Sequence, residues 1–228
     1  MEGPLSFNAA GNENFPPQTG EQYEGGVKLR TPSRNLNFTL AAYQITLNNV
    51  VVPTGTFFTV PTGSALPGQA ISRLDGEERS RGVETELQWQ PIPNWQIQAG
   101  YAYCKAVIAA SLTNPFTVGD DLANAPRNTA NFWTRYNVPR GILAGLGFGA
   151  GVIYVGKVWA GSPTTALYYQ LPDWVSVDGA AYYVWGRYDF ALNVRNLLDR
   201  RYIASDPSPT TLNVGEQREI TLSVGVRF

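Results

Sequence analysis

The sequence contains no histidine and only one cysteine, Cys104. Without histidine, the chain lacks the most common general base and the most common metal ligand of proteins. A Ser-His-Asp or Cys-His arrangement for nucleophilic catalysis is therefore excluded, and a lone cysteine excludes a disulfide within the chain. We predict no catalytic residue, no resident cofactor and no metal held directly by the protein, and we expect Cys104 to be a passive, serine-like residue.

Charged residues are also scarce, at 15% of the 228 residues, whereas about 25% is usual in a soluble domain. The mean hydropathy is nevertheless slightly negative. This combination suits a wall with one apolar and one polar face better than a globule with a charged surface. The net charge of −1 and the lack of a basic cluster argue against nucleic acid as a partner.

Long apolar runs are missing as well. No stretch of about 18 apolar residues occurs, which excludes a transmembrane helix. Residues 1–14 are polar and lack the charged-then-apolar pattern of a secretory signal. If the protein is exported, we therefore expect that Met1 is not its true N-terminus.

Alternation of apolar and polar residues with a period of two is the main pattern that is present, and it predicts β-strands with two different faces. Near the end of the chain, Ile220 and Leu222 alternate with Thr221 and Ser223. About nine such segments occur, each near the 9–11 residues that a tilted strand needs to cross a bilayer. They cover residues 23–29, 36–42, 83–89, 95–104, 130–137, 145–154, 175–183, 188–195 and 220–228.

The connections between these segments alternate in length. Long unstructured connections are uncommon in compact domains, but transmembrane barrels combine short periplasmic turns with longer extracellular loops. We therefore predict an all-β antiparallel meander that forms part of an outer-membrane β-barrel and contacts outer-membrane lipid. The predicted short turns are 31–35, 90–94, 138–142 and 185–187, and the predicted long connections are 46–78, 106–126, 157–173 and 199–217.

One face of the predicted strands is polar. Lys or Arg facing lipid costs about 2–4 kcal/mol at the bilayer midplane, so the charged side chains are expected to point into the lumen. There they either guide a solute or contact a plug, or they pair with one another, and for individual residues we favour pairing. The polar residues predicted to face the lumen are Glu84, Glu86, Gln88, Arg135, Arg195 and Arg227.

Glycines alternate along residues 145–151, at positions 145, 147, 149 and 151. No helix follows them, so the run is not a nucleotide-binding loop. We expect a close backbone approach or a bend in the barrel wall at this point.

Six stretches, in order along the chain, resemble the C-terminal half of the TonB-dependent siderophore receptors of the ferrichrome and ferric-coprogen type. The most specific contains Asn196, Asp199 and Tyr202, together with a terminal aromatic residue, Phe228. The six stretches are Thr19–Lys28 (TGEQYEGGVK), Arg79–Glu84 (RSRGVE), Asn94–Tyr103, Pro126–Asn131, Leu192–Tyr202 (LNVRNLLDRRY) and Gly215–Phe228.

The resemblance implies a 22-strand barrel that is filled by an N-terminal plug domain and imports ferric siderophores with energy relayed by TonB. It implies the outer membrane of a Gram-negative bacterium, iron that arrives already chelated, and a C-terminal Phe228 read by the barrel-assembly machinery. Residues 1–20 would be the remnant of an extracellular loop, and residues 21–228 a segment of the barrel without its plug. An odd strand count with an extracellular start leads us to expect further strands before Glu21.

Aromatic residues in the long loops are candidates for ligand capture, although for each individual residue we favour packing within the loops. The candidates are Phe57, Phe58, Phe116, Trp159, Tyr168 and Tyr169. The acidic pairs Asp120–Asp121 and Glu77–Glu78 are expected to be solvated rather than catalytic.

Three alternatives remain open. A soluble β-sandwich also alternates and turns often, although it would not need every second connection to be long. A self-contained small barrel with a structural or adhesive role would need an even strand count, with residues 49–60 as an extra strand. A barrel enzyme of lipid hydrolysis or acyl transfer is disfavoured by the missing histidine.

Overall fold

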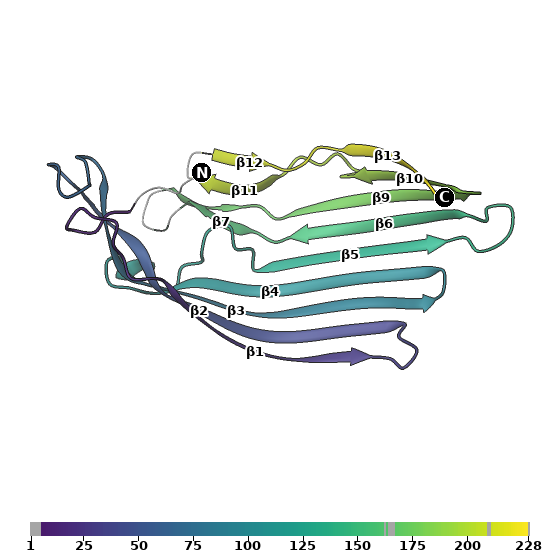
Figure 1. The fold of residues 1–228 in the computed structure, drawn as a ribbon, viewed down its shortest axis with the longest axis horizontal. Helices are drawn as coiled ribbons and strands as arrows, with labels where there is room; N and C mark the ends of the chain where they lie inside the picture. Colours follow the sequence, from purple (N-terminus) through teal and green to yellow (C-terminus); the bar gives the residue numbers. More distant parts are fainter. Residues whose placement is uncertain (1–5, 162, 164–166, 209–210, 228) are drawn as a thin grey trace.

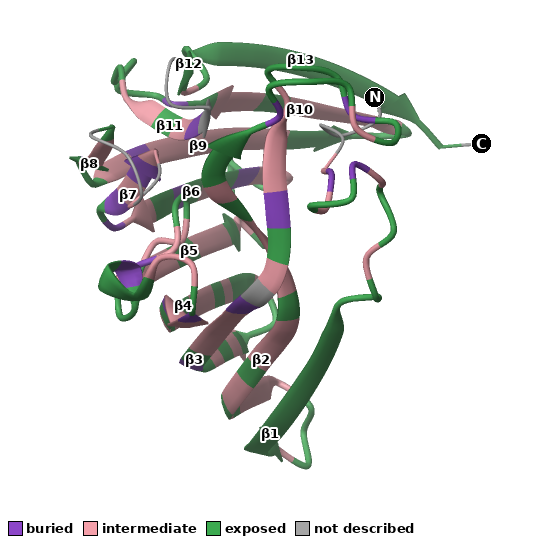
Figure 2. Cartoon of the chain, turned by 90° about the vertical axis from the view of Figure 1, so that its left-hand side faces the viewer, coloured by how far each residue is buried: buried purple, intermediate pink, exposed green. Residues whose placement is uncertain are grey.

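The computed structural model describes residues 6–161, 163, 167–208 and 211–227. Its described part is an antiparallel sheet of nine strands in which each strand pairs with the next one of the sheet along the chain. The sheet curves from β1 to β13, and no pairing joins these two outer strands in the part described (Figures 1 and 2). The nine strands are β1 (Thr19–Arg30), β2 (Leu36–Phe57), β3 (Ala70–Ile92), β4 (Trp95–Ser111), β5 (Asn128–Asn137), β6 (Leu146–Val155), β9 (Trp174–Trp185), β10 (Tyr188–Arg195) and β13 (Glu219–Val226).

The predicted meander and its alternation of short and long connections are confirmed. Four short turns lie at one edge of the sheet, at residues 31–35, 93–94, 138–145 and 186–187. Four longer connections lie at the opposite edge, which we call the loop edge (Figure 1). In the described part of the chain no helix is both long and apolar enough to cross a membrane.

The predicted extent of the long connections was wrong. Strands β2 and β3 stay paired as far as Phe57 and Ala70, so residues 46–57 and 70–78 are strand rather than loop. Asn49, with a φ of 60°, sits at a register shift between Asn48 and Val50. A bulge of this kind lets a ladder continue past turn-forming residues. The alternative in which residues 49–60 form an extra strand is also wrong, because most of them extend β2.

Two hairpins inside the long connections were not predicted. Strands β7 (Val158–Gly161) and β8 (Tyr168–Leu171) pair within the connection from β6 to β9. Strands β11 (Ile203–Ser208) and β12 (Thr211–Val214) pair within the connection from β10 to β13. A short 3-10 helix, η1 (Pro115–Thr117), lies between β4 and β5, in a connection that begins only after Ser111.

The strand register places the polar side chains on one face of the sheet. Directly opposed residues share a face: Glu86 opposes Gly100, and Gly100 in turn opposes Asn131. Followed across the sheet, the pairing places all six residues predicted to face the lumen on this side, the polar face. The opposite side, the apolar face, carries Val83, Leu87, Phe132, Phe148, Val152, Leu192 and Leu222.

The sheet itself encloses little buried apolar volume. On the apolar face, Phe148 is 52% exposed and Leu222 is 69% exposed. The two buried apolar clusters lie at the loop edge instead: one contains Phe7, Phe58 and Ala65, and the other contains Val158, Ala160 and Leu171. A contiguous exposed apolar surface marks an interaction with protein or membrane, so the apolar face fits a lipid contact.

The glycine run on β6 makes room for one aromatic ring. Atoms of Trp133 on β5 lie so close to β6 that an added Cβ would be 2.6 Å from the ring at Gly149 and 2.4 Å from it at Gly151. The glycine run therefore makes room for a side chain, the Trp133 ring on the polar face, whereas we had predicted a close backbone approach or a bend. Beside it, the Arg135 guanidinium carbon lies 3.8 Å from the centre of the Tyr182 ring.

Replacing Gly151 by alanine should therefore destabilise the sheet. The added methyl group must displace Trp133, and overpacking of this kind costs about 1–3 kcal/mol. We expect a lower urea midpoint for Gly151→Ala, and recovery of most of the loss in the Gly151→Ala/Trp133→Ala double variant. Gly25→Ala is the matched control, because a Cβ there meets nothing within 4 Å; equal losses at both glycines would contradict the packing argument.

Candidate functional site

A hollow at the loop edge has a volume of about 440 Å³. It lies where three segments meet: the end of the β4–β5 connection, the link between β6 and β7, and the start of β9. Arg127 and Lys157 supply positive charge to its wall, and Trp159 supplies an aromatic surface. We call it the loop hollow, and its lining residues are Asp121, Ala125, Arg127, Asn128, Tyr154, Gly156, Lys157, Trp159, Gln170 and Asp173.

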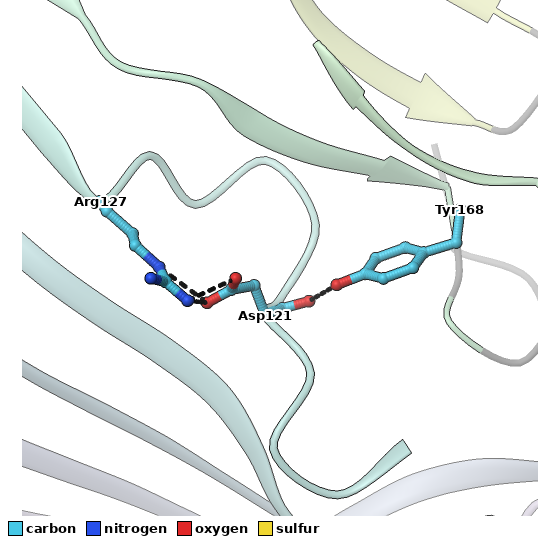
Figure 3. A network of polar contacts seen from close by, with 3 residues as sticks. All are labelled: Asp121, Arg127 and Tyr168. Atoms are coloured by element: carbon cyan, nitrogen blue, oxygen red, sulfur yellow. Dashed lines mark hydrogen bonds and ion pairs between the residues drawn. The ribbon is translucent and has the colours of Figure 1, made fainter. Parts of the chain in front are cut away.

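A polar network holds one wall of the loop hollow (Figure 3). The Arg127 guanidinium donates to both carboxylate oxygens of Asp121, with Nη2 lying 2.9 Å from Oδ1 and 2.8 Å from Oδ2. The Tyr168 hydroxyl donates to the main-chain carbonyl oxygen of Asp121 over 2.9 Å. Asp121 therefore joins the β4–β5 connection both to the start of β5 and to β8.

The backbone around Asp121 is fixed by the upper part of β4. The Ile108 amide donates to the Asp120 carbonyl over 3.0 Å, and the Leu122 amide donates to the Ala106 carbonyl over 2.9 Å. Asp121 is only 9% exposed. A buried carboxylate requires charge-assisted partners, and Arg127 meets that requirement.

The expectation that both acidic pairs are solvated was therefore wrong for Asp121. It also fails for Glu78, where partial burial raises the pKa of the carboxyl group. The neighbouring Glu77 forms an ion pair with Arg79. Glu77 and Glu78 lie on the upper part of β3, and Asp121 lies beside the upper part of β4. Both of these strand parts were expected to be loops, and their additional pairing accounts for the burial of Glu78 and Asp121.

Tyr168 and Trp159 form the aromatic part of the site. Their ring centroids are 4.4 Å apart and their planes are inclined by 14°. Burial raises the pKa of Tyr168, and the nearby carboxylates of Asp120 and Asp121 raise it further. A tyrosine hydroxyl is protonated at neutral pH at its ordinary pKa, and it acts here as the donor to the Asp121 carbonyl.

A second network, which sequence reasoning missed, ties three loop-edge segments together. The Asn124 side chain donates to the Asp206 carbonyl over 2.6 Å and accepts from the Asp206 amide over 2.9 Å. The Asp206 carboxylate accepts from the Gly161 amide over 2.8 Å, and the Asn124 amide donates to the Trp159 carbonyl over 2.8 Å. The walls of the loop hollow are therefore held in place before any ligand arrives.

The six candidate aromatic residues do not form one group. Trp159 and Tyr168 are stacked at the loop hollow. Tyr169 packs against the cluster of Val158, Ala160 and Leu171, and burial, with a contribution from nearby Asp206, raises its pKa. Phe58 is only 6% exposed within its own cluster, whereas Phe57 and Phe116 are 58% and 72% exposed. Ligand contact remains a prediction for all six.

The residues of the most specific sequence signature stabilise the β10–β13 connection. Asn196 is 2% exposed and adopts a φ of 45°. Its side chain donates to the carbonyls of Arg200 and Glu216 and accepts from the Arg200 amide, each over 2.9 Å. Its own amide donates to the Asp178 carboxylate over 2.9 Å. Asn196 therefore closes a turn and fixes it to β9.

Asp199 and Tyr202 continue the same structural role. The Asp199 carboxylate accepts from the Arg218 amide over 3.2 Å. The Tyr202 ring stacks on Trp174 with centroids 4.2 Å apart, and it lies so close to Gly215 that a Cβ there would be 2.2 Å from the ring. The remaining signature residue, Phe228, lies outside the described residues.

Charged residues on the polar face pair with one another in two places. Arg227 Nε donates to the Asp189 carboxylate over 2.7 Å, and Arg195 lies 3.7 Å from Glu219. Both pairs are more than one-third exposed, where ion pairs contribute little stability. The favoured role of mutual pairing therefore applies to these two arginines, whereas Arg135 rests on Tyr182.

The single cysteine lies on the same face. Cys104 opposes Gly82 in the sheet, and its Sγ lies 3.1 Å from the Ser80 hydroxyl oxygen. In the described part of the chain, no three acidic or cysteine side chains gather as a metal-binding cluster would.

The loop hollow combines two cationic side chains, Arg127 and Lys157, with two carboxylates, Asp121 and Asp173, and its aromatic surface comes from Tyr154 and Trp159. A concave surface with aromatic rings and polar groups of both charge signs can bind a polar small molecule that carries a ring. It contains no pair of groups arranged for nucleophile activation, which would require a base beside a nucleophile.

Comparison with known proteins bears on the family and the fold. A family model described as TonB dependent receptor-like, beta-barrel, matches residues 3–197. The ferrioxamine B receptor of Salmonella typhimurium is 32% identical over 99% of this chain and 30% of its own length. The ferrichrome outer membrane transporter/phage receptor of Escherichia coli K12 is 30% identical over 94% of this chain and 27% of its own length.

Solved structures give the same architecture. The pyoverdine outer membrane receptor of Pseudomonas aeruginosa PAO1 has a TM-score of 0.79 at 24% identity, covering 100% of this chain and 32% of the receptor. The siderophore receptor PiuA of Acinetobacter baumannii has a TM-score of 0.73 at 26% identity, covering 90% and 28% respectively. The chain thus spans about 30% of the length of the curated relatives it matches.

Proposed function

Because the chain belongs to the TonB-dependent receptor-like β-barrel family, we propose that it forms part of the barrel wall of a receptor that imports ferric siderophores. The observation that carries this proposal is the match to the ferrioxamine B receptor of Salmonella typhimurium, 32% identical over 99% of this chain. As a member of this family, the chain is an outer-membrane β-barrel segment of a Gram-negative bacterium.

The two faces of the sheet then acquire separate roles. The apolar face contacts lipid, and the polar face lines the lumen, because backbone and charged groups cannot be left unsatisfied in hydrocarbon. The short turns face the periplasm, and the loop edge faces the outside. The loop hollow would therefore lie on the side from which a siderophore arrives.

The complete receptor requires partners beyond this chain. The outer strands β1 and β13 each pair on one side only in the part described, and unpaired edges are not tolerated in a membrane. We propose that further strands complete the wall, that a plug domain fills the lumen, and that TonB supplies the energy. Recognition of Phe228 by the barrel-assembly machinery belongs to the same proposal. Iron enters only as part of the chelated cargo.

Growth of a siderophore-deficient host on supplied ferric siderophores tests the proposal. A host that expresses the receptor carrying this chain should take up radiolabelled iron from at least one siderophore class, and uptake should require TonB. Failure to take up any ferric siderophore, with the receptor present in the outer membrane, would show that the proposed cargo is wrong.

An equilibrium binding assay with the siderophore identified by uptake tests the loop hollow. We expect Trp159→Ala to weaken equilibrium binding of the cognate ferric siderophore about tenfold, since loss of a buried aromatic contact commonly costs more than about 1 kcal/mol. Leu112→Ala is the control, because Leu112 is 77% exposed and lies at the start of the β4–β5 connection, outside the hollow and outside the six candidate residues. If both variants bind equally well, the ligand contacts lie elsewhere.

A further inference from the structure

The turn between β5 and β6 differs from the other short turns. It contains eight residues, 138–145, whereas the others contain between two and five, and it extends farthest from the sheet at this edge (Figure 1). It is nevertheless ordered: the Val138 amide donates to the Leu146 carbonyl over 2.7 Å, and the Ala144 amide donates to the Gly141 carbonyl over 3.1 Å.

The tip of this turn is apolar and open. Ile142 is 101% exposed and Leu143 is 52% exposed. The charged residue of this turn is Arg140, two positions before Ile142, and it is also exposed. Two exposed aliphatic side chains beside one cation are typical of a segment at a membrane interface, where apolar groups enter the acyl region and the charge stays among the headgroups.

An apolar hollow of about 610 Å³ lies on the apolar face next to this turn. Three aromatic rings, of Trp95, Tyr136 and Phe148, stand in one row across β4, β5 and β6. The next row toward the bilayer centre contains the smaller Thr134 and Ala150, which oppose each other. The change from large to small residues leaves the depression. Its lining residues are Ile92, Trp95, Thr134, Tyr136, Phe148, Gly149 and Ala150.

The indole of Trp95 and the hydroxyl of Thr134, which lie beside this hollow, are already engaged. The Trp95 indole nitrogen donates to the Thr134 hydroxyl over 2.8 Å, and that hydroxyl donates to the Gln96 carbonyl over 3.1 Å. The surface left to a ligand is therefore almost entirely hydrocarbon, which suits an acyl chain and does not suit a polar molecule.

The edge that carries this hollow is positively charged. The four short turns contain three arginines, Arg34, Arg140 and Arg187, and neither aspartate nor glutamate. A cation beside an apolar groove complements a lipid that has an anionic headgroup and a hydrocarbon tail. Of the three arginines, only Arg140 lies in a turn whose flanking strands both line the hollow.

We propose that the β5–β6 turn and the apolar hollow together form a binding site for one phospholipid of the periplasmic leaflet, with an acyl chain in the hollow and the headgroup phosphate on Arg140. Ile142 and Leu143 enter the hydrocarbon beside the bound lipid and hold the turn against the membrane. The proposal rests on the membrane placement of the sheet and is independent of the cargo.

Native mass spectrometry of the receptor purified from outer membranes, with added dioleoylphosphatidylglycerol as the probe, tests this site. Each arginine near a membrane surface contributes about 1 kcal/mol to anionic lipid binding, so Arg140→Gln should lower the fraction with one retained lipid about fivefold. Ala150→Phe, which fills the hollow without placing charge on the lipid face, should lower it as well.

Two matched variants separate a defined site from a general affinity for lipid. Arg34→Gln removes a cation from another short turn, and Leu222→Phe adds ring volume elsewhere on the apolar face; both should retain the lipid as the parent does. Equal loss in Arg34→Gln and Arg140→Gln, or unchanged retention in Arg140→Gln, would overturn the proposal. Heat-dependent electrophoretic mobility confirms that each variant is folded. If the parent receptor retains no lipid but takes up siderophore normally, the lipid site is refuted and the proposed cargo is not.

Discussion

Replacing Phe132 by arginine should remove most of the assembled protein from the outer membrane. Phe132 lies in the middle of β5 on the apolar face, opposite Ala99 and Val152, and is 43% exposed. An arginine facing lipid at the bilayer midplane costs about 2–4 kcal/mol, and the contacts of the phenyl ring are lost in addition. The folded fraction, measured by heat-dependent electrophoretic mobility, should fall sharply, and the urea midpoint of the remainder should fall with it.

The neighbouring residue provides the control. Asn131 lies on the polar face, opposite Gly100, and Glu86 opposes Gly100 from the other side. In Asn131→Arg the new cation faces water and a nearby carboxylate, so assembly should stay close to that of the parent. Similar behaviour of the two variants, one residue apart, would show that the faces have been assigned to the wrong environments.

Replacing Asn196 by alanine should destabilise the C-terminal part of the sheet by about 3 kcal/mol. The substitution removes three side-chain hydrogen bonds at a residue that is 2% exposed, and each buried group left without its partner costs about 1–3 kcal/mol. Alanine also tolerates a φ of 45° poorly. Urea-induced unfolding, followed by intrinsic tryptophan fluorescence, measures the loss.

Two companion variants separate the causes of that loss. Asn196→Gly removes the same hydrogen bonds but accepts the positive φ, so it should be about 1 kcal/mol more stable than Asn196→Ala. Asn213→Ala removes an exposed asparagine on β12 that donates to the Ser205 hydroxyl over 3.0 Å, and it should change stability little. If Asn196→Ala is as stable as Asn213→Ala, then Asn196 does not hold the turn.

The faces of the sheet could be predicted because the pleat has a fixed period of two. Once Glu84, Glu86 and Gln88 are assigned to one side, every directly opposed residue follows by register. The alternation of short and long connections was equally visible, since glycine, proline and asparagine mark the turns. These features depend on local sequence, and local sequence was sufficient for them.

The extent of β2 and the two loop hairpins could not be predicted by the same means. Asn49, Pro53 and Gly55 are ordinary turn residues, yet β2 continues past them because β3 pairs with it again beyond each register shift, as far as Phe57. Strands β7, β8 and β12 have only four residues each, and β11 has six, too few for periodicity to be recognised.

The site was predicted in composition but not in geometry. Trp159 and Tyr168 were predicted as candidates because they are aromatic residues of the long loops. Their stacking depends on the β7–β8 register, which pairs Gly161 with Tyr168. The link between Asn124 and Asp206 joins residues 82 apart in the chain. Asn124 has a φ of 56°, a left-handed conformation that it shares with Asn196, and that conformation is not visible in the sequence.

The great length of β2 and β3 has a consequence for what another cell or molecule meets first. A strand of 22 residues spans about 70 Å at roughly 3.3 Å per residue, and after a tilt of about 40° it still rises far above a hydrocarbon core of about 30 Å. The hairpin therefore projects from the rest of the loop edge (Figure 1). Its tip contains the small buried cluster of Phe7, Phe58 and Ala65 and projects outward beyond the loop hollow. Antibodies against the intact bacterium should therefore reach this tip more readily than they reach the loop hollow.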